Sequence, residues 1–438
     1  MFRRKIEKVI EQYLTGNDDR ILCVDGARQV GKSYIIRYLA QKYFQNYIEI
    51  NMMDDLNGDR LFQNARTIND FYVQASIIAG DRMKNRSDTI IFIDEIQAYP
   101  HLLTMLKPLR YDNRFKYICS GSLLGVTLQK VISIPMGSLT EVKMYPMDFE
   151  EFLWANGVGE QAIDYMKQCF LEEKTLDEAT HIKMLNLFKT YLYVGGLPDA
   201  VKAFTETKNV YNIRAIQSEI HMYYSDDAAK YDTANKLKIK RIYEMIPSTI
   251  DNKVKRLQLT DIEGKKDARY LKYQNEFDYL ISSGIAISVT AISEPKFPLI
   301  QSSSKNLIKL YMNDVGLLTN ILYSYNINAI LDDRTGVNLG AVYETAVAQE
   351  IKAHHDNVYY YDRRKVGEVD YLIDDYSQLS VLPIEVKSAR DNYQFSALPK
   401  LLSTDTYRIK NGYVLSNDRE IRCEGKIKYF PIYFIMFI

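Results

Sequence analysis

Short apolar runs alternate with longer segments of helical periodicity along the first third of the chain. The apolar runs occupy residues 20–25, 46–51, 89–94 and 115–119, and each has the length and composition of a strand buried on both faces. Strands that alternate with helices in this way build mostly parallel sheets, with ligands at the carboxyl ends of the strands. Residues 1–155 are therefore expected to form an α/β domain.

The pattern changes after residue 155. Residues 156–330 are more polar and mainly helical, and near their end the helical segments are followed by two short apolar stretches at 286–292 and 297–300. Helices followed by an apolar hairpin suggest a helical, winged-helix-like domain. Residues 331–438 combine a helical stretch with apolar strands and are expected to form an α/β domain. Three domains agree with a length of 438 residues.

Charge changes this picture only locally. The chain carries 56 basic and 56 acidic residues, so it lacks the overall positive charge of proteins that attract nucleic acid as a whole. Residues 236–272 are the exception, with eleven Lys or Arg against five Asp or Glu. This basic segment is a candidate DNA contact, which would give salt-sensitive binding. The alternative is a solvated, charged helix face, and the sequence leaves both open.

Neither end of the chain has the pattern of a membrane or export segment. Residues 1–7 are charged, unlike a signal peptide, and the apolar run at 429–438 is too short to span a bilayer. Cys23 and Cys119 lie in apolar runs without C-x-x-C spacing, so we expect reduced thiols in the core. These features predict a cytoplasmic protein that does not bind a membrane.

A phosphate-binding motif lies between the first apolar run and a helical pattern. Residues 26–33 read GARQVGKS, a complete G-x-x-x-x-G-K-[ST] loop. Glycines bring backbone N–H groups close to a triphosphate, the lysine binds the β and γ phosphates, and the serine hydroxyl binds Mg²⁺. The following helix directs its positive dipole end at the same anion. We therefore predict that ATP and Mg²⁺ bind here. The expected contact residues are Gly26, Ala27, Arg28, Gln29, Val30, Gly31, Lys32 and Ser33.

The third apolar run ends in two acids, Asp94 and Glu95. We expect its strand to lie beside the strand that leads into the loop, with Asp94 holding Mg²⁺ and Glu95 orienting or deprotonating the attacking water. Ser120 follows the fourth run and is either a γ-phosphate sensor or part of a Ser-Gly turn. Arg110 and Arg114 precede that run, and either is a candidate arginine finger for a neighbouring subunit of a homo-oligomer.

A second group of polar residues lies in the last portion of the chain. Glu344 lies in a helical stretch, Asp370 in an apolar strand, and Glu385-x-Lys387 in the next strand, where period-two alternation puts both side chains on one face. Two carboxylates with a lysine nearby fit a divalent-metal phosphodiester site, with Asp370 and Glu385 as Mg²⁺ ligands. Glu344 would complete the metal shell, and Lys387 would stabilise the nucleophilic water or the phosphorane charge. Acid-x-basic pairs are also common in amphipathic strands, so a structural role stays open.

Together these stretches resemble a group of bacterial and archaeal ATPases in which an AAA-type ATPase precedes a C-terminal region catalogued as a domain of unknown function. The resemblance extends over nearly the whole chain, and such an ordered series of matches is more specific than any single motif. It is carried by residues 26–33, 47–51, 92–97 with Pro100, 120–122, 145–153, 191–198, 309–318 and 338–345.

The resemblance implies an AAA-type P-loop ATPase core, a winged-helix-like middle domain and a C-terminal domain similar to PD-(D/E)xK nucleases. The residues that match the family's functional positions are Lys32, Ser33, Asp94 and Glu95 in the ATPase part, and Glu344, Asp370, Glu385 and Lys387 in the nuclease-like part. One departure is Ser138, because many members place an arginine after the glycine that corresponds to Gly137.

The sequence thus predicts a Mg²⁺-dependent ATPase that is coupled to DNA binding or processing through a nuclease-like domain. The alternative is a nucleotide-dependent switch, in which the nuclease-like domain only binds a partner. The near-neutral overall charge favours the switch, whereas the set of Asp370, Glu385 and Lys387 favours the nuclease. The expected partners are ATP, DNA through residues 236–272, and further copies of the chain.

Overall fold

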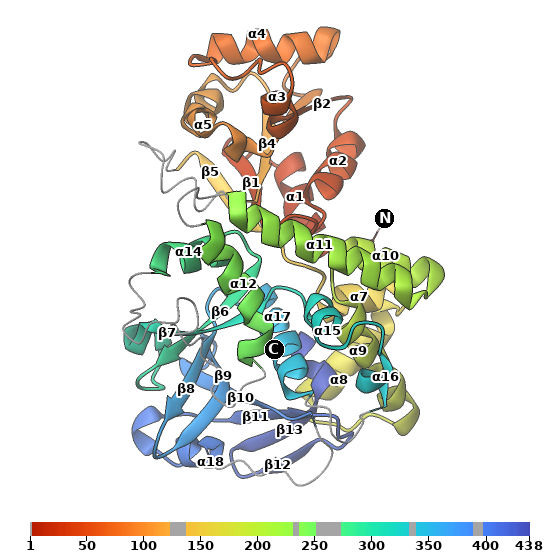
Figure 1. Ribbon diagram of the computed structural model, residues 1–438, viewed down its shortest axis with the longest axis vertical. Helices are drawn as coiled ribbons and strands as arrows, with labels where there is room; N and C mark the ends of the chain where they lie inside the picture. The colour runs from red at the N-terminus through yellow and green to blue at the C-terminus, as the bar shows by residue number, and fades with distance from the viewer. Residues whose placement is uncertain (1, 123–136, 231–235, 251–272, 333–338, 389–396) are drawn as a thin grey trace. The chain divides into compact units, whose positions relative to one another are not determined.

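The computed structural model describes residues 2–122, 137–230, 236–250, 273–332, 339–388 and 397–438 (Figure 1). The chain forms two compact units. The first contains residues 3–145 and 282–285, and the second contains residues 146–281 and 286–438. Each unit has its own sheet and its own hydrophobic core.

The first unit is built around a five-stranded sheet with the order β2-β3-β4-β1-β5, in which all paired strands are parallel. Its strands are β1 (Ile21–Asp25), β2 (Asn46–Asn51), β3 (Thr89–Asp94), β4 (Lys116–Gly121) and β5 (Leu139–Lys143). Its helices are α1 (Glu7–Thr15), α2 (Lys32–Tyr43), α3 (Met52–Asn57), α4 (Ile68–Ala79) and α5 (Pro100–Asp112), with 3-10 turns η1 (Gly80–Arg82) and η2 (Ile96–Ala98). The four apolar runs are confirmed as strands of a parallel sheet.

The order of the strands differs from the expected one. β4 pairs with β1 on one side and with β3 on the other. The expectation that the strand ending in Asp94 lies beside the strand leading into the phosphate loop is therefore wrong. After β3 the chain crosses over through α5 and returns into the middle of the sheet as β4. A local hydrophobic pattern predicts each strand but not its position in the order of the sheet.

Both faces of this sheet are buried, as the unbroken apolar runs predict. One face packs against α4 and α5, where Ile50 and Ile91 share a buried cluster with Phe71 and Leu106. Strand residues whose side chains point to the other face of the sheet, such as Phe92, are also fully buried. In Figure 1, α2 and α5 lie to either side of the strands.

The two core cysteines form a disulfide rather than remaining reduced. Cys23 and Cys119 are direct register partners on β1 and β4, and their Cα atoms lie 4.7 Å apart. The expectation of reduced thiols is wrong here, because pairing of two strands that are 96 residues apart brings the sulfurs together. Cys169, which is buried, and Cys423, which is exposed, are free.

The second unit contains an eight-stranded mixed sheet with the order β12-β13-β11-β10-β9-β8-β6-β7. Its strands are β6 (Ala286–Ile292), β7 (Ser303–Met312), β8 (Tyr359–Arg363), β9 (Gly367–Asp375), β10 (Ser380–Val386), β11 (Gly412–Ser416), β12 (Arg422–Glu424) and β13 (Ile427–Pro431). Its helices are α7 (Phe149–Ala155), α8 (Glu160–Leu171), α9 (Glu178–Val194), α10 (Pro198–Thr207), α11 (Val210–Lys230), α12 (Lys236–Ile250), α14 (Gln274–Ser282), α15 (Val315–Tyr323), α16 (Asn328–Leu331), α17 (Gly340–His354) and α18 (Ala397–Leu402), with 3-10 turns η4 (Leu299–Ser302), η5 (Asp405–Tyr407) and η6 (Ile432–Phe437).

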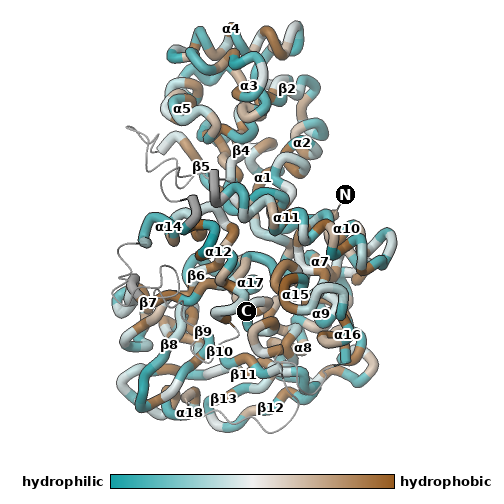
Figure 2. The backbone as a smooth tube through the Cα atoms, viewed as in Figure 1, coloured by the Kyte–Doolittle hydropathy of each residue, from teal (hydrophilic) through white to brown (hydrophobic). Residues whose placement is uncertain are grey.

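Strands from before and after residue 330 share this sheet. The antiparallel hairpin of β6 and β7 joins it through a parallel pair between β6 and β8. This hairpin is the one that the sequence assigned to a winged-helix-like domain, and that assignment stays a prediction. Figure 2 shows hydrophobic residues along β6 and β11. Within the part of the chain that the structure describes, none of the helices is long and apolar enough to cross a membrane.

Buried polar contacts join the helices of the second unit, and most of the residues that make them lie in segments that carry the family resemblance. Asp314 caps α15 and accepts hydrogen bonds from the backbone N–H groups of Gly196 at 2.6 Å and Leu317 at 3.1 Å. The Tyr191 hydroxyl of α9 accepts from Gln349 Nε2 of α17 at 2.8 Å. These polar residues therefore serve the packing of the helices, which explains part of the sequence similarity without a catalytic role.

Candidate nucleotide site and second polar cluster

The phosphate loop connects β1 to α2, as predicted. Gly26 has a φ of +153°, and a Cβ atom at this position would lie 2.2 Å from the carbonyl oxygen of Met144. Gly31 precedes the helix with a φ of +96°. Among the described residues no side chain caps this helix end, and its first turn contains no acid. The first N–H groups of α2 are therefore available to an anion.

Lys32 lies at the start of α2 with its ammonium inside the loop. Nζ donates to the carbonyl oxygens of Gly26 at 2.9 Å and Ala27 at 2.8 Å. Burial lowers the pKa of Lys32, and the nearby carboxylates of Glu95, Asp25 and Asp94 oppose that effect. A phosphate placed on this ammonium would favour its charged form further.

Asp94 is the centre of the hydrogen-bond network at this edge of the sheet. Its Oδ2 accepts from Ser33 Oγ at 2.8 Å, and its Oδ1 accepts from Ser120 Oγ and from the Glu95 N–H at 3.0 Å. The structure thus brings the loop serine, the acid of β3 and the serine of β4 together. Ser120 lies within β4 and is fully buried, so it is not merely part of a Ser-Gly turn.

Glu95 follows β3 directly and adopts a left-handed backbone conformation, with a φ of +51°. Its Oε2 accepts a hydrogen bond from Gln97 Nε2, which also donates to Ser122 Oγ at 3.3 Å. No sequence motif predicted a role for Gln97. The available signal was its place in the segment 92–97, which carries the family resemblance.

Asp25 is a further acid at this site that no sequence motif predicted. It ends β1 just before the loop, is buried, and its Oδ1 has no hydrogen-bond partner among the described residues. Burial raises the pKa of Asp25 to about 6; Glu141 adds to this effect, while Lys143 and Lys32 oppose it. The only sequence signal is an acid at the end of an apolar strand, which gives no measure of burial.

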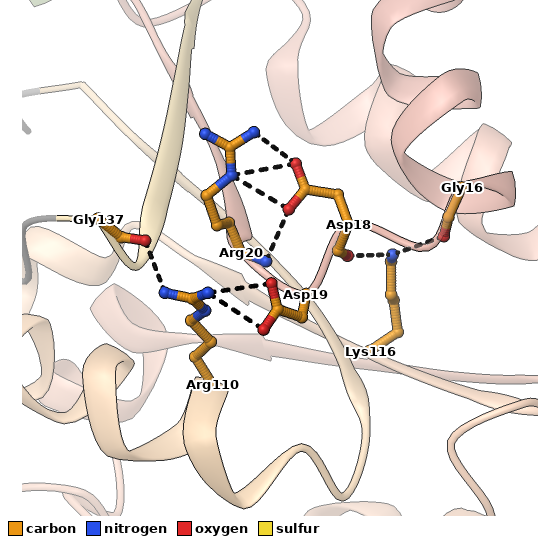
Figure 3. Close-up of polar contacts among 7 residues, drawn as sticks. All are labelled: Gly16, Asp18, Asp19, Arg20, Arg110, Lys116 and Gly137. Atoms are coloured by element: carbon orange, nitrogen blue, oxygen red, sulfur yellow. Dashed lines mark hydrogen bonds and ion pairs between the residues drawn. The ribbon is translucent and has the colours of Figure 1, made fainter.

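The two candidate arginine fingers lie at the other edge of the sheet, near the amino ends of its strands. Arg110 donates to both carboxylate oxygens of Asp19 at 3.0 and 3.1 Å and to the carbonyl oxygen of Gly137 at 2.6 Å (Figure 3). Arg114 pairs with Asp112 at 3.4 Å. Because the phosphate loop lies at the carboxyl edge, neither arginine is placed to serve the nucleotide of its own chain.

The second polar cluster lies on α17, β9 and β10. Val386 N–H donates to Asp370 Oδ2 at 2.9 Å, and Lys387 Nζ lies 3.7 Å from Glu385 Oε2. Asp370, Glu385 and Lys387 thus come together on neighbouring strands. Glu344 on α17 is also buried, and its Oε2 accepts from the Tyr311 hydroxyl at 3.3 Å. Across the described ranges, no group of three or more His, Cys, Asp or Glu side chains is suited to hold a metal ion, and the metal roles here stay predictions.

The basic segment 236–272 is described only in part. Its first portion forms α12, where Lys240 lies 3.6 Å from Asp226 and 3.9 Å from Glu244. Residues 251–272 lie outside the described residues. The described ion pairs fit a solvated, charged helix face, and DNA binding by this segment stays a prediction.

Three family models match the chain. Residues 18–153 match a model described as an AAA domain. Residues 185–326 and 339–435 match two models described as domains of unknown function, DUF8612 and DUF4143. The first match agrees with the loop, the acids and the parallel sheet, so the chain contains an AAA-type P-loop ATPase domain. The nuclease-like character of the last part is not among these findings.

The similar proteins add little about function. An uncharacterized protein of Haemophilus influenzae is 24% identical over 200 residues, which are 45% of this chain and 44% of that protein, so the match spans less than half of the relative's length. The Walker-type ATPase PABY2304 of Pyrococcus abyssi is 14% identical, with 73% of this chain and 95% of that chain covered and a TM-score of 0.44. The ORC2 protein of Aeropyrum pernix is 13% identical, with 75% of this chain and 93% of that chain covered and a TM-score of 0.39. At these identities and TM-scores, neither likeness assigns a role to this chain.

Proposed function

We propose that the protein hydrolyses ATP to ADP and phosphate in a Mg²⁺-dependent reaction. The observation that carries this proposal is the Asp94 carboxylate, which accepts hydrogen bonds from Ser33 of the phosphate loop and Ser120 of β4. Glu95 follows it directly, and the Lys32 ammonium lies in the adjoining loop. The phosphate loop, the proposed metal ligand Asp94 and the proposed base Glu95 therefore lie at one edge of the sheet.

The residues present fit Mg²⁺ and a triphosphate. Ser33 Oγ and Asp94 Oδ2, 2.8 Å apart, are the hard oxygen atoms that would hold the metal. The Lys32 ammonium donates to two carbonyl oxygens of the loop, which a phosphate would replace as acceptors. When bound, Mg²⁺ neutralises charge that develops on the phosphate oxygens.

In the proposed reaction, Lys32 and the first N–H groups of α2 hold the β and γ phosphates in place. Glu95 orients a water molecule and accepts its proton as the water oxygen attacks the γ phosphorus. The bond between the γ phosphorus and the bridging oxygen breaks, and ADP leaves with that electron pair. The Ser120 hydroxyl stays on Asp94 and fixes its orientation.

Two substitutions test the ATPase proposal. Lys32→Ala should abolish ATP binding or turnover because it removes the buried ammonium. Glu95→Gln should keep ATP binding and lower turnover by about 10²-fold or more, since an amide cannot accept the proton. The measurements are calorimetric ATP binding in the presence of Mg²⁺ and release of phosphate. Turnover of Glu95→Gln at the wild-type rate would exclude Glu95 as the base.

For the second unit we propose Mg²⁺-dependent cleavage of DNA, controlled by the ATPase. The support is the placement of Asp370 beside Val386 and the 3.7 Å separation of Lys387 from Glu385 on the neighbouring strand β10. Asp370 and Glu385 would hold the metal, and Lys387 would stabilise charge on the phosphate. Glu344, which the sequence offered as a third ligand, does not form a three-acid metal group with them among the described residues. Burial of Glu344, Asp370 and Glu385 instead favours the switch, in which this domain binds a partner without cutting it.

A plasmid-nicking assay with Mg²⁺ or Mn²⁺ separates these two functions. Wild-type protein should nick the plasmid, and Asp370→Ala and Lys387→Ala should each lose at least about 10²-fold in rate, because each removes one charged group of the cluster. Phosphate release from ATP should stay unchanged in both variants, which serves as the control. Absence of cutting by the wild type, on duplex and on single strands, would support the switch.

A further inference from the structure

Gln97 contacts the base of the proposed ATPase directly. It lies in the 3-10 turn η2, and its Nε2 donates to Glu95 Oε2 and to Ser122 Oγ, the latter at 3.3 Å. Glu95 follows β3, and Ser122 follows β4, which pairs with β3. One side-chain amide thus joins the ends of two neighbouring strands at the nucleotide edge.

Chemistry determines which end of this amide faces the acid. An ionised carboxylate only accepts hydrogen bonds, so the NH₂ group must face Glu95. The other end, Gln97 Oε1, is buried and has no hydrogen-bond partner among the described residues. A buried acceptor without a donor is unfavourable, and so is the left-handed backbone of Glu95. Two unfavourable features next to each other indicate a local geometry kept for function rather than for stability.

We propose that Gln97 is a positioning residue for ATP hydrolysis. Its amide holds the Glu95 carboxylate in the orientation from which it accepts a proton from the attacking water, and so this proposal rests on the proposed ATPase function. The end of β4 is linked to both acids, because Ser120 donates to Asp94 and Ser122 is connected to Glu95 through Gln97. A shift of this strand end would therefore move Asp94, the proposed metal ligand, and Glu95, the proposed base, together.

A double-mutant cycle on the full chain tests the proposal. Gln97→Leu keeps the volume of the side chain and removes its donors, so kcat should fall by about 10-fold while KM changes by less than about 2-fold. In a Glu95→Gln background the same substitution should cause no further loss, because Gln97 acts through Glu95. A residue that only stabilised the fold would lower the single-turnover rate in both backgrounds. Gln63→Leu, at an exposed glutamine of the same unit, is the matched control.

Two further variants cover the case in which Gln97→Leu does not fold. Ser122→Ala removes one anchor of the amide, and Gln97→Asn keeps the amide but shortens its reach. Both should lower kcat by less than about 10-fold, and only when Glu95 is present. The role of Gln97 would be excluded, with the ATPase function intact, by either of two results. One is an equal loss of kcat in the wild-type and Glu95→Gln backgrounds, and the other is a wild-type kcat in Gln97→Leu, Gln97→Asn and Ser122→Ala. Wild-type turnover no higher than that of Lys32→Ala would instead overturn the ATPase function, and the role of Gln97 with it.

Discussion

Burial decides the charge of the acid that precedes the phosphate loop. Asp25 lies at the end of β1, and burial raises its pKa from 3.8 to about 6. Between these two values the folded chain binds a proton more tightly than the unfolded chain does. Stability therefore falls as the pH rises from about 4 to about 6, and the loss persists at higher pH. An acid retained at this energetic cost beside Lys32 indicates a site adapted to charge rather than to stability.

Replacing Asp25 with its uncharged isostere should expose this cost. Asp25→Asn should be more stable than the wild type at pH 7, by up to about 3 kcal/mol, because the charge at residue 25 is then no longer buried. The difference should shrink towards zero below pH 4, where the wild-type acid is protonated in both states. Urea unfolding of both proteins at the two pH values provides the measurement.

Asp18 is a control with the opposite sign. Hydrogen bonds from Arg20 lower the pKa of Asp18 to about 2, so its charged form stabilises the fold at neutral pH (Figure 3). That contribution is present above the unfolded value and is lost as the pH falls through about 2. Asp18→Asn should therefore lower stability at pH 7. A destabilised Asp25→Asn protein at pH 7 would contradict the account of Asp25.

Motifs made the local part of the site predictable. The sequence placed Lys32 and Ser33 in the phosphate loop and Asp94 at a strand end, and the structure brings all three together. Asp25 and Gln97 escaped prediction for a physical reason. Their properties depend on burial and on contacts across strands, which a linear pattern does not contain.

At the scale of elements, periodicity predicted the strands of the first unit but not their order. Unbroken apolar runs require burial on both faces, which fixes the class of sheet. The position of β4 between β1 and β3 depends on how α5 packs where the chain crosses over. No local sequence pattern predicts this packing. The disulfide between Cys23 and Cys119 escaped prediction for the same reason, since it follows from the pairing of β1 with β4.

A helix start in the second unit gives a stability test. Asp314→Ala would leave the buried N–H groups of Gly196 and Leu317 without their acceptor, and we expect a loss of about 2–4 kcal/mol. Asp314→Asn keeps one acceptor oxygen and should lose less. Urea unfolding, followed by the fluorescence of the single tryptophan Trp154, which lies in the same unit, measures both. Wild-type stability of Asp314→Ala would show that these contacts do not hold α15.

At the scale of the whole molecule, charge and composition could not show which segments share a sheet. The sequence predicted a boundary at residue 330, yet β6 from before it pairs with β8 from after it, and β7 joins the same sheet through β6. The sequence pattern of a hairpin is the same whether the hairpin belongs to a small separate domain or extends a larger sheet. The division into three domains therefore stays a prediction.

Association of chains gives the last prediction. If a neighbouring subunit completes the ATP site, the arginine it supplies must be accessible. The Arg110 side chain is 19% exposed and is held by Asp19 and Gly137, whereas the Arg114 side chain is 54% exposed. We therefore expect Arg114 to be the finger. Specific ATPase activity should rise with protein concentration, and Arg114→Ala should lower kcat by about 10³-fold without loss of ATP binding.

Mixing two inactive proteins distinguishes a finger supplied by a neighbour from a local structural effect. A chain with Lys32→Ala still carries Arg114, and a chain with Arg114→Ala still carries a complete phosphate loop. In a mixed oligomer the first chain can serve the second, so phosphate release should exceed the sum of the two separate activities. Arg110→Ala in place of Arg114→Ala is the control, and its defect should follow loss of stability because its mostly buried guanidinium is held by Asp19 and Gly137. A mixture no more active than its components would mean that Arg114 does not act across a subunit boundary.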